Sequence, residues 1–202
     1  ALKLGQRVRA LMPEALKTRI PPAEAAGDWP APRHPRRMLV LQGCVQPALK
    51  PNINAATARV LDRLGISLVA ASEAGCCGAL PHHLNDADAG LASARRNIAA
   101  WIPHLDAGAE AIVMTASGCG VMVKDYGWLL RSDPAYAEKA ARVSAATQDL
   151  SEILVAERDA LKALGASATA RRIAYHPPCT LQHGQKLTGG VEALLGDAGF
   201  EL

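Results

Sequence analysis

Short apolar runs alternate with longer segments of helical periodicity along most of the chain. Runs of aliphatic residues predict strands at 38–42, 66–71, 111–115 and 172–175. Apolar residues three or four positions apart predict helices at 52–64, 85–105, 120–130 and 149–164. Because strands that alternate with helices pair through right-handed crossovers, the sequence predicts an α/β fold with a mostly parallel, doubly wound sheet.

Helix ends are marked by residues that favour them. Asn52 and Asn85 are candidate N-caps, and Gly65 and Gly165 are candidate helix stops.

The first 36 residues are predicted to form a separate region. An amphipathic stretch from Leu2 to Leu16 is followed by a proline-rich connector, which cannot form a regular helix or a central strand. Residues 1–37 carry eight basic and three acidic side chains, whereas the whole chain has a net charge of only +3. We interpret residues 1–36 as a basic arm, which is either a solvated linker or a segment that docks on a partner subunit or an anionic membrane face.

Composition narrows the class of protein. The chain has 202 residues, 50% of them hydrophobic and 3% aromatic, which favours helices packed on a sheet over an all-β sandwich. A net charge of +3 carries no polybasic signature for nucleic acid. No apolar segment reaches the length of a membrane span, and no signal peptide opens the chain. We expect a cytoplasmic protein, with peripheral contact on the inner face of the cytoplasmic membrane as an option for the arm.

Every cysteine lies just after a predicted strand. Cys44 follows the first strand, the adjacent Cys76 and Cys77 follow the second, Cys119 follows the third and Cys179 follows the fourth. The carboxyl ends of parallel strands meet at one edge of a sheet, so these thiols are expected along one rim. An odd number of cysteines, two of them adjacent, also points to a reducing compartment rather than to structural disulfides.

The residue types indicate a metal cluster. Convergent thiolates bind zinc or iron–sulfur clusters, but the Cys-x-x-Cys knuckles usual for zinc are absent from this sequence. Adjacent cysteines between Gly75 and Gly78 suit a cluster whose metal ions lie apart. Two alternatives stay open, namely inert buried thiols and a dithiol redox enzyme. No glycine-rich phosphate loop follows the first strand, so neither a nucleotide nor a flavin is expected on this chain.

Four sequence strings resemble a known family. They are LQGCVQP around Cys44, GCCGA around Cys76 and Cys77, TASGCGVMVKDYG around Cys119, and YHPPCTLQH around Cys179. They are similar to the cysteine-rich CCG domain shared by the glycolate oxidase iron–sulfur subunit, lactate-utilisation proteins and a heterodisulfide reductase subunit. The similarity runs from about Trp29 to the end, and residues 51–65 make it especially specific to the glycolate oxidase branch.

The resemblance implies a division of the chain and a set of ligands. Residues 37–168 would form a first cysteine-rich domain, and residues 169–202 would begin a second repeat that continues past this sequence. Neither Ala116 nor Met122 supplies a second cysteine to pair with Cys119, so the five-cysteine cluster of the reductase branch is not expected. The ligands of an ordinary cluster of the 4Fe–4S type would then be Cys44, Cys76, Cys77 and Cys119. Cys179 would bind a different cluster.

The resemblance also implies a function. A separate flavoprotein subunit would oxidise glycolate to glyoxylate, and this chain would pass the electrons on toward quinone, with no catalytic residue of its own. The alternatives are a lactate-utilisation iron–sulfur protein, or a zinc-containing or metal-free scaffold on which the flavoprotein docks.

Overall fold

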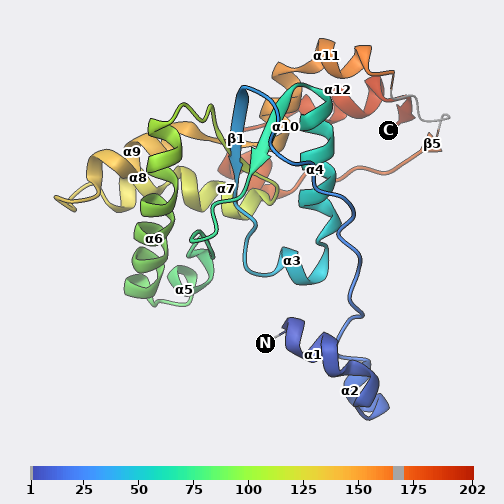
Figure 1. Ribbon diagram of the computed structural model, residues 1–202, viewed down its shortest axis with the longest axis horizontal. Coiled ribbons are helices and arrows are strands. Elements are labelled where there is room, and N and C mark those ends of the chain that lie inside the picture. Colours follow the sequence, from blue (N-terminus) through green and yellow to red (C-terminus); the bar gives the residue numbers. More distant parts are fainter. Residues whose placement is uncertain (1, 166–170) are drawn as a thin grey trace.

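The computed structural model describes residues 2–165 and 171–202, and a four-stranded sheet forms its centre (Figure 1). The strands are β1 (Arg36–Val40), β2 (Ile66–Val69), β3 (Ile112–Met114) and β4 (Thr147–Asp149). Their order is β2-β1-β3-β4, and each neighbouring pair is parallel. The predicted α/β fold with a parallel sheet is therefore confirmed.

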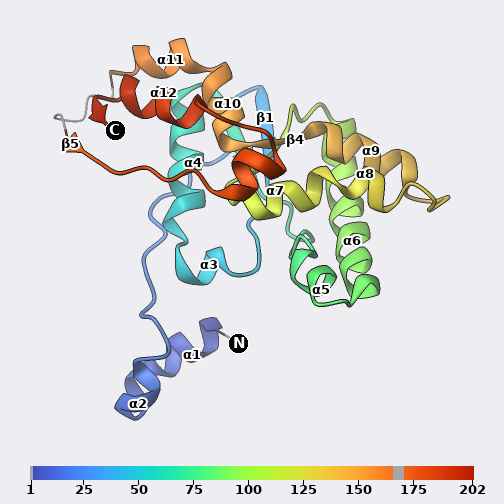
Figure 2. The same cartoon turned by 180° about the vertical axis from the view of Figure 1, so that it is seen from behind.

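Helices cover both faces of this sheet. The helices between residues 46 and 163 are α3 (Gln46–Leu49), α4 (Asn52–Arg63), α5 (Ala79–His83), α6 (Ala87–Asp106), α7 (Ser117–Lys124), α8 (Tyr126–Leu129), α9 (Ala137–Ala146), α10 (Leu150–Ala156) and α11 (Arg158–Ala163). Figures 1 and 2 show α4 and α10 on one side of the sheet and α6, α8 and α9 on the other.

Alternation along the strands explains the two layers. Leu39 of β1 belongs to a buried cluster that includes Trp101 of α6. Its neighbours Met38 and Val40 belong to a second cluster that includes Leu61 of α4. Successive strand residues point to opposite faces, so a strand that is apolar at every position must be covered on both sides.

The region after β3 departs from the prediction. Neither the strand β4 nor the helix α9 was expected. The strand has three residues, which are too few to display an alternating pattern. The predicted helix at 149–164 is two helices, α10 and α11, joined at Glu157. Asp149 ends β4 and caps α10, where its carboxylate accepts a hydrogen bond from the Ser151 N–H at 3.0 Å. Gly165 ends this region with a φ of +67°, as expected for a helix stop.

The two asparagine N-caps were wrong. Asn52 is the first residue of α4 and follows Pro51, which has no side chain able to cap. Asn85 has a φ of +65°, and the next residue, Asp86, caps α6 by accepting a hydrogen bond from the Ala89 N–H at 3.2 Å. Both errors concern single positions at helix ends, which sequence patterns define only to within one or two residues.

The N-terminal arm contains α1 (Leu2–Val8), a short 3-10 helix (Arg9–Leu11) and α2 (Glu14–Lys17), followed by an extended segment. The helices α1 and α2 lie apart from the sheet (Figure 1), whereas the extended segment lies along its edge. The Trp29 indole donates a hydrogen bond to the Leu68 carbonyl at 3.2 Å, and the Arg33 N–H donates to the Ser67 hydroxyl at 3.0 Å. The proline-rich segment thus covers the outer edge of β2, which would otherwise offer open backbone groups.

The chain ends in a small separate sheet. Strands β5 (Arg171–Arg172) and β6 (Phe200–Glu201) pair in parallel, with a π-helix (Thr180–Gly184) and α12 (Gly190–Asp197) between them. The strand expected at 172–175 is shorter and begins one residue earlier. The predicted domain boundary at 168/169 lies outside the described residues, and the assignment of 169–202 to a second repeat stays a prediction.

A helix that spans a membrane needs about 20 consecutive, mostly apolar residues. In residues 2–165 and 171–202, no helix is both long and apolar enough to cross a bilayer.

Candidate functional site

A cavity of about 570 Å³ opens at the carboxyl edge of the sheet. It is lined by four of the five cysteines, namely Cys44, Cys76, Cys77 and Cys119. Three of the strands lead to this cavity: Cys44 follows β1, Cys76 and Cys77 follow β2, and Cys119 follows β3. β2 and β3 lie on opposite sides of β1, so the cavity lies where the chain reverses its direction across the sheet. Ligands of open parallel sheets bind at such positions.

The cysteines differ in exposure. Cys77 is buried, Cys76 and Cys119 are half-buried, and Cys44 is exposed. Cys179 is also exposed and is not among the residues that line the cavity, although its neighbour Thr180 is. The structure therefore brings together four of the predicted ligands and leaves Cys179 outside the group. Their roles as cluster ligands stay predictions.

Two buried polar side chains hold the loop with the adjacent cysteines. Asn97 of α6 accepts a hydrogen bond from the Gly75 N–H at 2.8 Å and donates one to the Cys76 carbonyl at 2.9 Å. The Tyr126 hydroxyl donates to the Cys77 carbonyl at 2.7 Å and accepts from the Asn97 amide at 3.1 Å. Asn97 and Tyr126 are fully buried, so these bonds fix the loop from beneath.

Gly78 makes the tight turn after the cysteines possible. Its φ is +88°, and a Cβ at this position would lie 2.7 Å from the Gly90 carbonyl oxygen. Its N–H also donates a hydrogen bond to the Cys76 sulfur at 3.4 Å. Hydrogen bonds to ligand sulfur atoms are one of the means by which proteins tune cluster potentials.

A second polar network supports the loop of Cys44. The Gln46 amide donates hydrogen bonds to Asn54 at 2.8 Å and to the Thr115 hydroxyl at 2.9 Å. Asn54 in turn donates to the Gln42 carbonyl at 3.2 Å. Gln42 and Gln46 bracket Cys44, so the network joins its loop to α4 and to the end of β3.

Cys119 lies in the first turn of α7, against the C-terminal segment. A Cβ on Gly120 would lie 2.7 Å from the Gln185 amide nitrogen, which donates a hydrogen bond to the Ser117 carbonyl at 3.1 Å. The Ser117 and Thr180 hydroxyls hydrogen-bond at 2.7 Å. The glycine after Cys119 therefore permits the close approach of residues 180–185.

The thiols influence one another. A hydrogen bond from Cys119 lowers the pKa of Cys77 to about 6, and the same bond together with burial raises the pKa of Cys119. Burial, followed by a hydrogen bond with Cys44, raises the pKa of Cys76. Burial likewise raises the pKa of Tyr126, which keeps its hydroxyl protonated and able to donate. The four sulfur atoms thus form one interacting group.

This donor set fits an iron–sulfur cluster. Soft sulfur donors from two loops and from the first turn of α7 surround a cavity that is larger than a single ion requires. Within the described ranges, no three His, Cys, Asp or Glu side chains are arranged around a point that would suit a single metal ion.

Asn97 and Tyr126 were not predicted from the sequence as parts of the site. A signal for Asn97 existed, since it lies between Ala94, Ile98 and Trp101 on the apolar face of α6. A polar residue on such a face needs a buried partner. The identity of that partner is a property of the fold, because Tyr126 lies 29 residues further along the chain.

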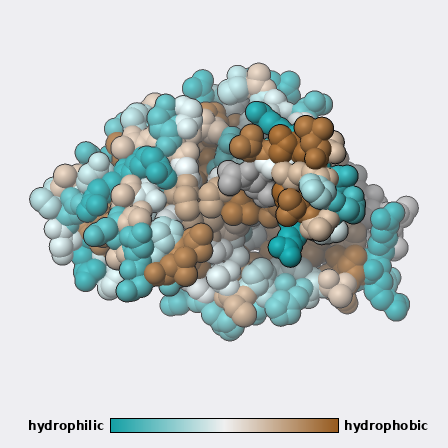
Figure 3. All heavy atoms as spheres, turned by 90° about the horizontal axis from the view of Figure 1, so that it is seen from below, coloured by the Kyte–Doolittle hydropathy of each residue, from teal (hydrophilic) through white to brown (hydrophobic). Residues whose placement is uncertain are grey.

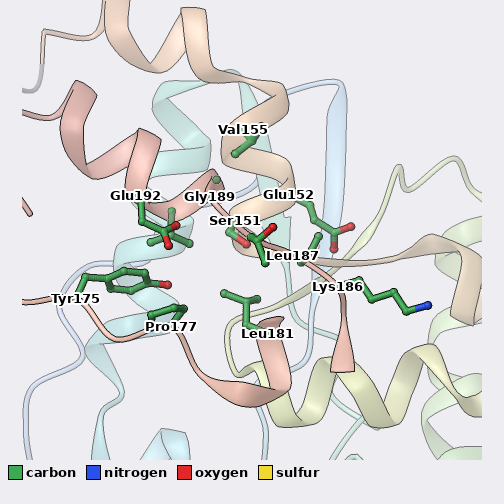
Figure 4. A pocket seen from close by; sticks show the side chains of 13 residues that line it. Ser151, Glu152, Val155, Tyr175, Pro177, Leu181, Lys186, Leu187, Gly189 and Glu192 are labelled. Atoms are coloured by element: carbon green, nitrogen blue, oxygen red, sulfur yellow. The ribbon is translucent and has the colours of Figure 1, made fainter. Parts of the chain in front are cut away.

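A second cavity, of about 350 Å³, contains no cysteine. Figure 4 shows Tyr175, Ser151 and Glu192 around it, beneath α10 and α12. Burial, followed by the charge of Glu192, raises the pKa of Tyr175.

Comparisons with known proteins agree with the site. Residues 38–124 match the family model of the cysteine-rich domain CCG. The chain is 52% identical to the glycolate oxidase iron-sulfur subunit of Escherichia coli (strain K12), over 99% of this chain and 49% of that protein. It is 32% identical to the probable glycolate oxidase iron-sulfur subunit of Bacillus subtilis (strain 168), over 73% of this chain and 32% of the relative.

A third relative comes from another branch. It is lactate utilization protein A of Bacillus licheniformis, which is 30% identical over 74% of this chain and 59% of its own length. The chain thus spans about half the length of the curated relatives that it matches. The resemblance found from the cysteine strings is confirmed.

Proposed function

We propose that this chain is part of an iron–sulfur electron-transfer subunit of a glycolate oxidase, and the match of residues 38–124 to the family model of the cysteine-rich domain CCG supports this proposal. The observation that carries the proposal is the convergence of Cys44, Cys76, Cys77 and Cys119 on one cavity. These cysteines are the proposed ligands of a cluster of the 4Fe–4S type. When bound, such a cluster accepts and releases single electrons.

The protein residues position and shield this group. Asn97 and Tyr126 hold the backbone of Cys76 and Cys77, so that both adjacent sulfur atoms are presented to the cavity. The Gly78 N–H stabilises negative charge on the Cys76 sulfur. The buried position of Cys77 removes part of the site from water, which favours the less charged state of the site.

The proposed partners follow from placing glycolate oxidation and electron transfer on different subunits. Oxidation of glycolate to glyoxylate releases two electrons and requires a hydride or electron acceptor, which we assign to a separate flavoprotein subunit. Electrons then leave this subunit toward quinone. No side chain of this chain is proposed as catalytic, and Cys179 is proposed as a ligand of a different cluster.

The N-terminal arm is proposed as the contact with an anionic membrane surface, on the cytoplasmic side. Lys3, Arg7 and Arg19 are exposed on it, together with the apolar side chains of Leu4, Leu11 and Leu16. Figure 3, which views the side of the molecule on which the arm lies, shows apolar side chains gathered in separate patches among polar ones. Exposed basic and apolar residues on a short amphipathic segment suit an interfacial position.

Cluster reduction by substrate tests the proposal. The whole protein, purified anaerobically together with its flavoprotein partner, should develop the paramagnetic signal of a reduced cluster when glycolate is added, because electrons enter the cluster. Loss of visible absorbance is not a sufficient readout, because reduction of the flavin also bleaches the visible spectrum. D-Lactate and L-lactate serve as the comparison substrates, since one relative belongs to lactate utilisation. Faster appearance of the signal with lactate would assign the chain to that branch instead, and no signal with any of the three would refute electron transfer from a hydroxy acid.

A further inference from the structure

Three of the cysteines that line the large cavity have a backbone that is held in place. The Cys76 carbonyl accepts a hydrogen bond from Asn97 at 2.9 Å, and the Cys77 carbonyl accepts one from Tyr126 at 2.7 Å. Cys119 lies within α7, where the regular bonds of the helix fix the backbone. The sulfur atoms of these three residues are therefore attached to rigid parts of the fold.

The backbone of Cys44 is less constrained. Cys44 lies in the irregular segment between β1 and α3, and its own N–H and carbonyl form no hydrogen bond in the described part of the chain. The polar network of this loop reaches the Gln42 carbonyl and the Gln46 side chain, on either side of Cys44. Gly43, which precedes Cys44, has a φ of +78° and no atom within 4 Å of the position of a Cβ. The segment thus has room to move at Cys44 itself.

Cys44 is also the most accessible of the four. It is exposed, whereas Cys76 and Cys119 are half-buried and Cys77 is only 4% exposed. Cys44 lines both the large cavity and a neighbouring one of about 360 Å³. Cys119 lines both as well, but from a helix. A metal ion bound by Cys44 would therefore be the one that solvent reaches most easily.

Resting on the proposed function, we infer that Cys44 binds an exchangeable metal ion of the cluster, and that the three other cysteines hold the rest of the cluster in place. The ligand class of this position is a ferrous ion, or another divalent cation that accepts thiolate and sulfide ligands. Accessibility and a mobile backbone both favour loss of the metal ion from this position rather than from the other three.

Dioxygen is the oxidant that would release this ion. One electron passes from the oxidised four-iron cluster to dioxygen, which becomes superoxide. The bond from Cys44 Sγ to its iron breaks, as do the bonds from that iron to sulfide, and the iron leaves as Fe²⁺. The cluster loses two positive charges with Fe²⁺ and regains one with the departed electron, and all its sulfide stays. The free Cys44 thiolate then takes a proton from water. Added Fe²⁺ and one electron from dithionite reverse the step.

Thiol labelling tests which cysteine is released. The whole protein, loaded with clusters, is exposed briefly to dioxygen, treated with iodoacetamide and mapped by mass spectrometry, and paramagnetic resonance is recorded in parallel. The signal of a three-iron cluster should appear, and labelling of Cys44 should exceed that of Cys76, Cys77 or Cys119 at least about tenfold, because ligating sulfur atoms are protected. Treatment with Fe²⁺ and dithionite, followed by desalting, should restore the protection of Cys44.

Cys44→Ala and Cys77→Ala form a matched pair, since both remove one sulfur ligand. Relative to the parent protein, Cys44→Ala should lose about one iron and no sulfide, whereas Cys77→Ala should lose about four of each. Equal losses in the two variants would overturn the inference. Labelling of Cys76, Cys77 or Cys119 in place of Cys44 would also overturn it, as would a protein whose iron content and labelling do not change with dioxygen. A parent protein without iron and sulfide would instead overturn the proposed function.

Discussion

The bond between Tyr126 and the cysteine loop leads to a sharp prediction about stability. Tyr126→Phe removes one hydroxyl and leaves the ring in place. The Cys77 carbonyl, which now accepts a hydrogen bond at 2.7 Å, loses its donor, and the Asn97 amide loses an acceptor at 3.1 Å. The phenyl ring that replaces the buried Tyr126 side chain still covers both groups, so water does not readily replace the lost partner.

The expected loss in the free energy of unfolding follows from that geometry. A buried polar group left without a partner costs about 1–3 kcal/mol. With a urea m-value of about 2 kcal/mol/M, a loss of about 2 kcal/mol lowers the unfolding midpoint by about 1 M. The assay is urea unfolding of the reduced apoprotein, followed by far-UV circular dichroism. The m-value should stay unchanged, because the variant exposes no additional surface on unfolding.

Tyr136→Phe provides the control. Its ring lies near Arg95 and Lys139, and the replacement preserves the ring. Its hydroxyl forms no hydrogen bond within residues 2–165 and 171–202, so the midpoint should shift by less than about 0.25 M. The reasoning about the loop would be refuted if Tyr126→Phe had the midpoint of the parent protein, or if both variants lost the same stability.

Three further predictions concern other parts of the molecule. Gly78→Ala should destabilise the protein by more than about 1 kcal/mol and reduce its iron content, because the new Cβ meets the Gly90 carbonyl at a φ of +88°. Gly196→Ala in α12 is the control, because its Cβ has no atom within 4 Å and Gly196 does not line the cysteine cavity, so neither stability in chemical unfolding nor iron content should fall. Arg33 and His34 lower the pKa of Asp62. Attachment of the arm should therefore persist above the ordinary aspartate pKa and be lost as the pH falls through the lower pKa of Asp62 in the folded state. Pepsin should then cleave residues 21–35 faster, and cleavage that does not depend on pH would contradict this. Neutralising Lys3, Arg7 and Arg19 with glutamine should reduce sedimentation with anionic vesicles at low salt, and unchanged sedimentation would leave the arm as a linker.

The parallel sheet was predictable because its strands are buried on both faces. Met38, Leu39 and Val40 are all apolar, and such continuous runs are typical of central parallel strands. The positions of the cysteines after these runs were then sufficient to place four of them at one edge. Strand β4 could not be recognised in the same way, because Thr147, Gln148 and Asp149 have no apolar pattern and pair with β3 through backbone bonds.

The supporting residues of the site depend on contacts that are distant in sequence. Gln46 and Thr115 are 69 residues apart, and Ser117 and Thr180 are 63 apart, so no local pattern reveals either pair. The position of Cys179 outside the cavity has the same origin. Like the other cysteines it follows a predicted strand, but that strand, β5, belongs to the smaller sheet rather than to the central one. The edge at which a cysteine lies is thus set by the sheet that its strand joins.

Metal analysis of the whole protein, purified and handled without oxygen, tests the central claim most directly. The protein and its Cys77→Ser and Cys179→Ser variants are assayed for iron, acid-labile sulfide and zinc. If Cys44, Cys76, Cys77 and Cys119 bind a 4Fe–4S cluster, Cys77→Ser should lose roughly four iron and four sulfide per chain, together with the corresponding paramagnetic signal. The signal of that cluster should survive in Cys179→Ser. A colourless protein that contains zinc or no metal, or a Cys77→Ser variant with the full iron and sulfide content of its parent, would contradict the account.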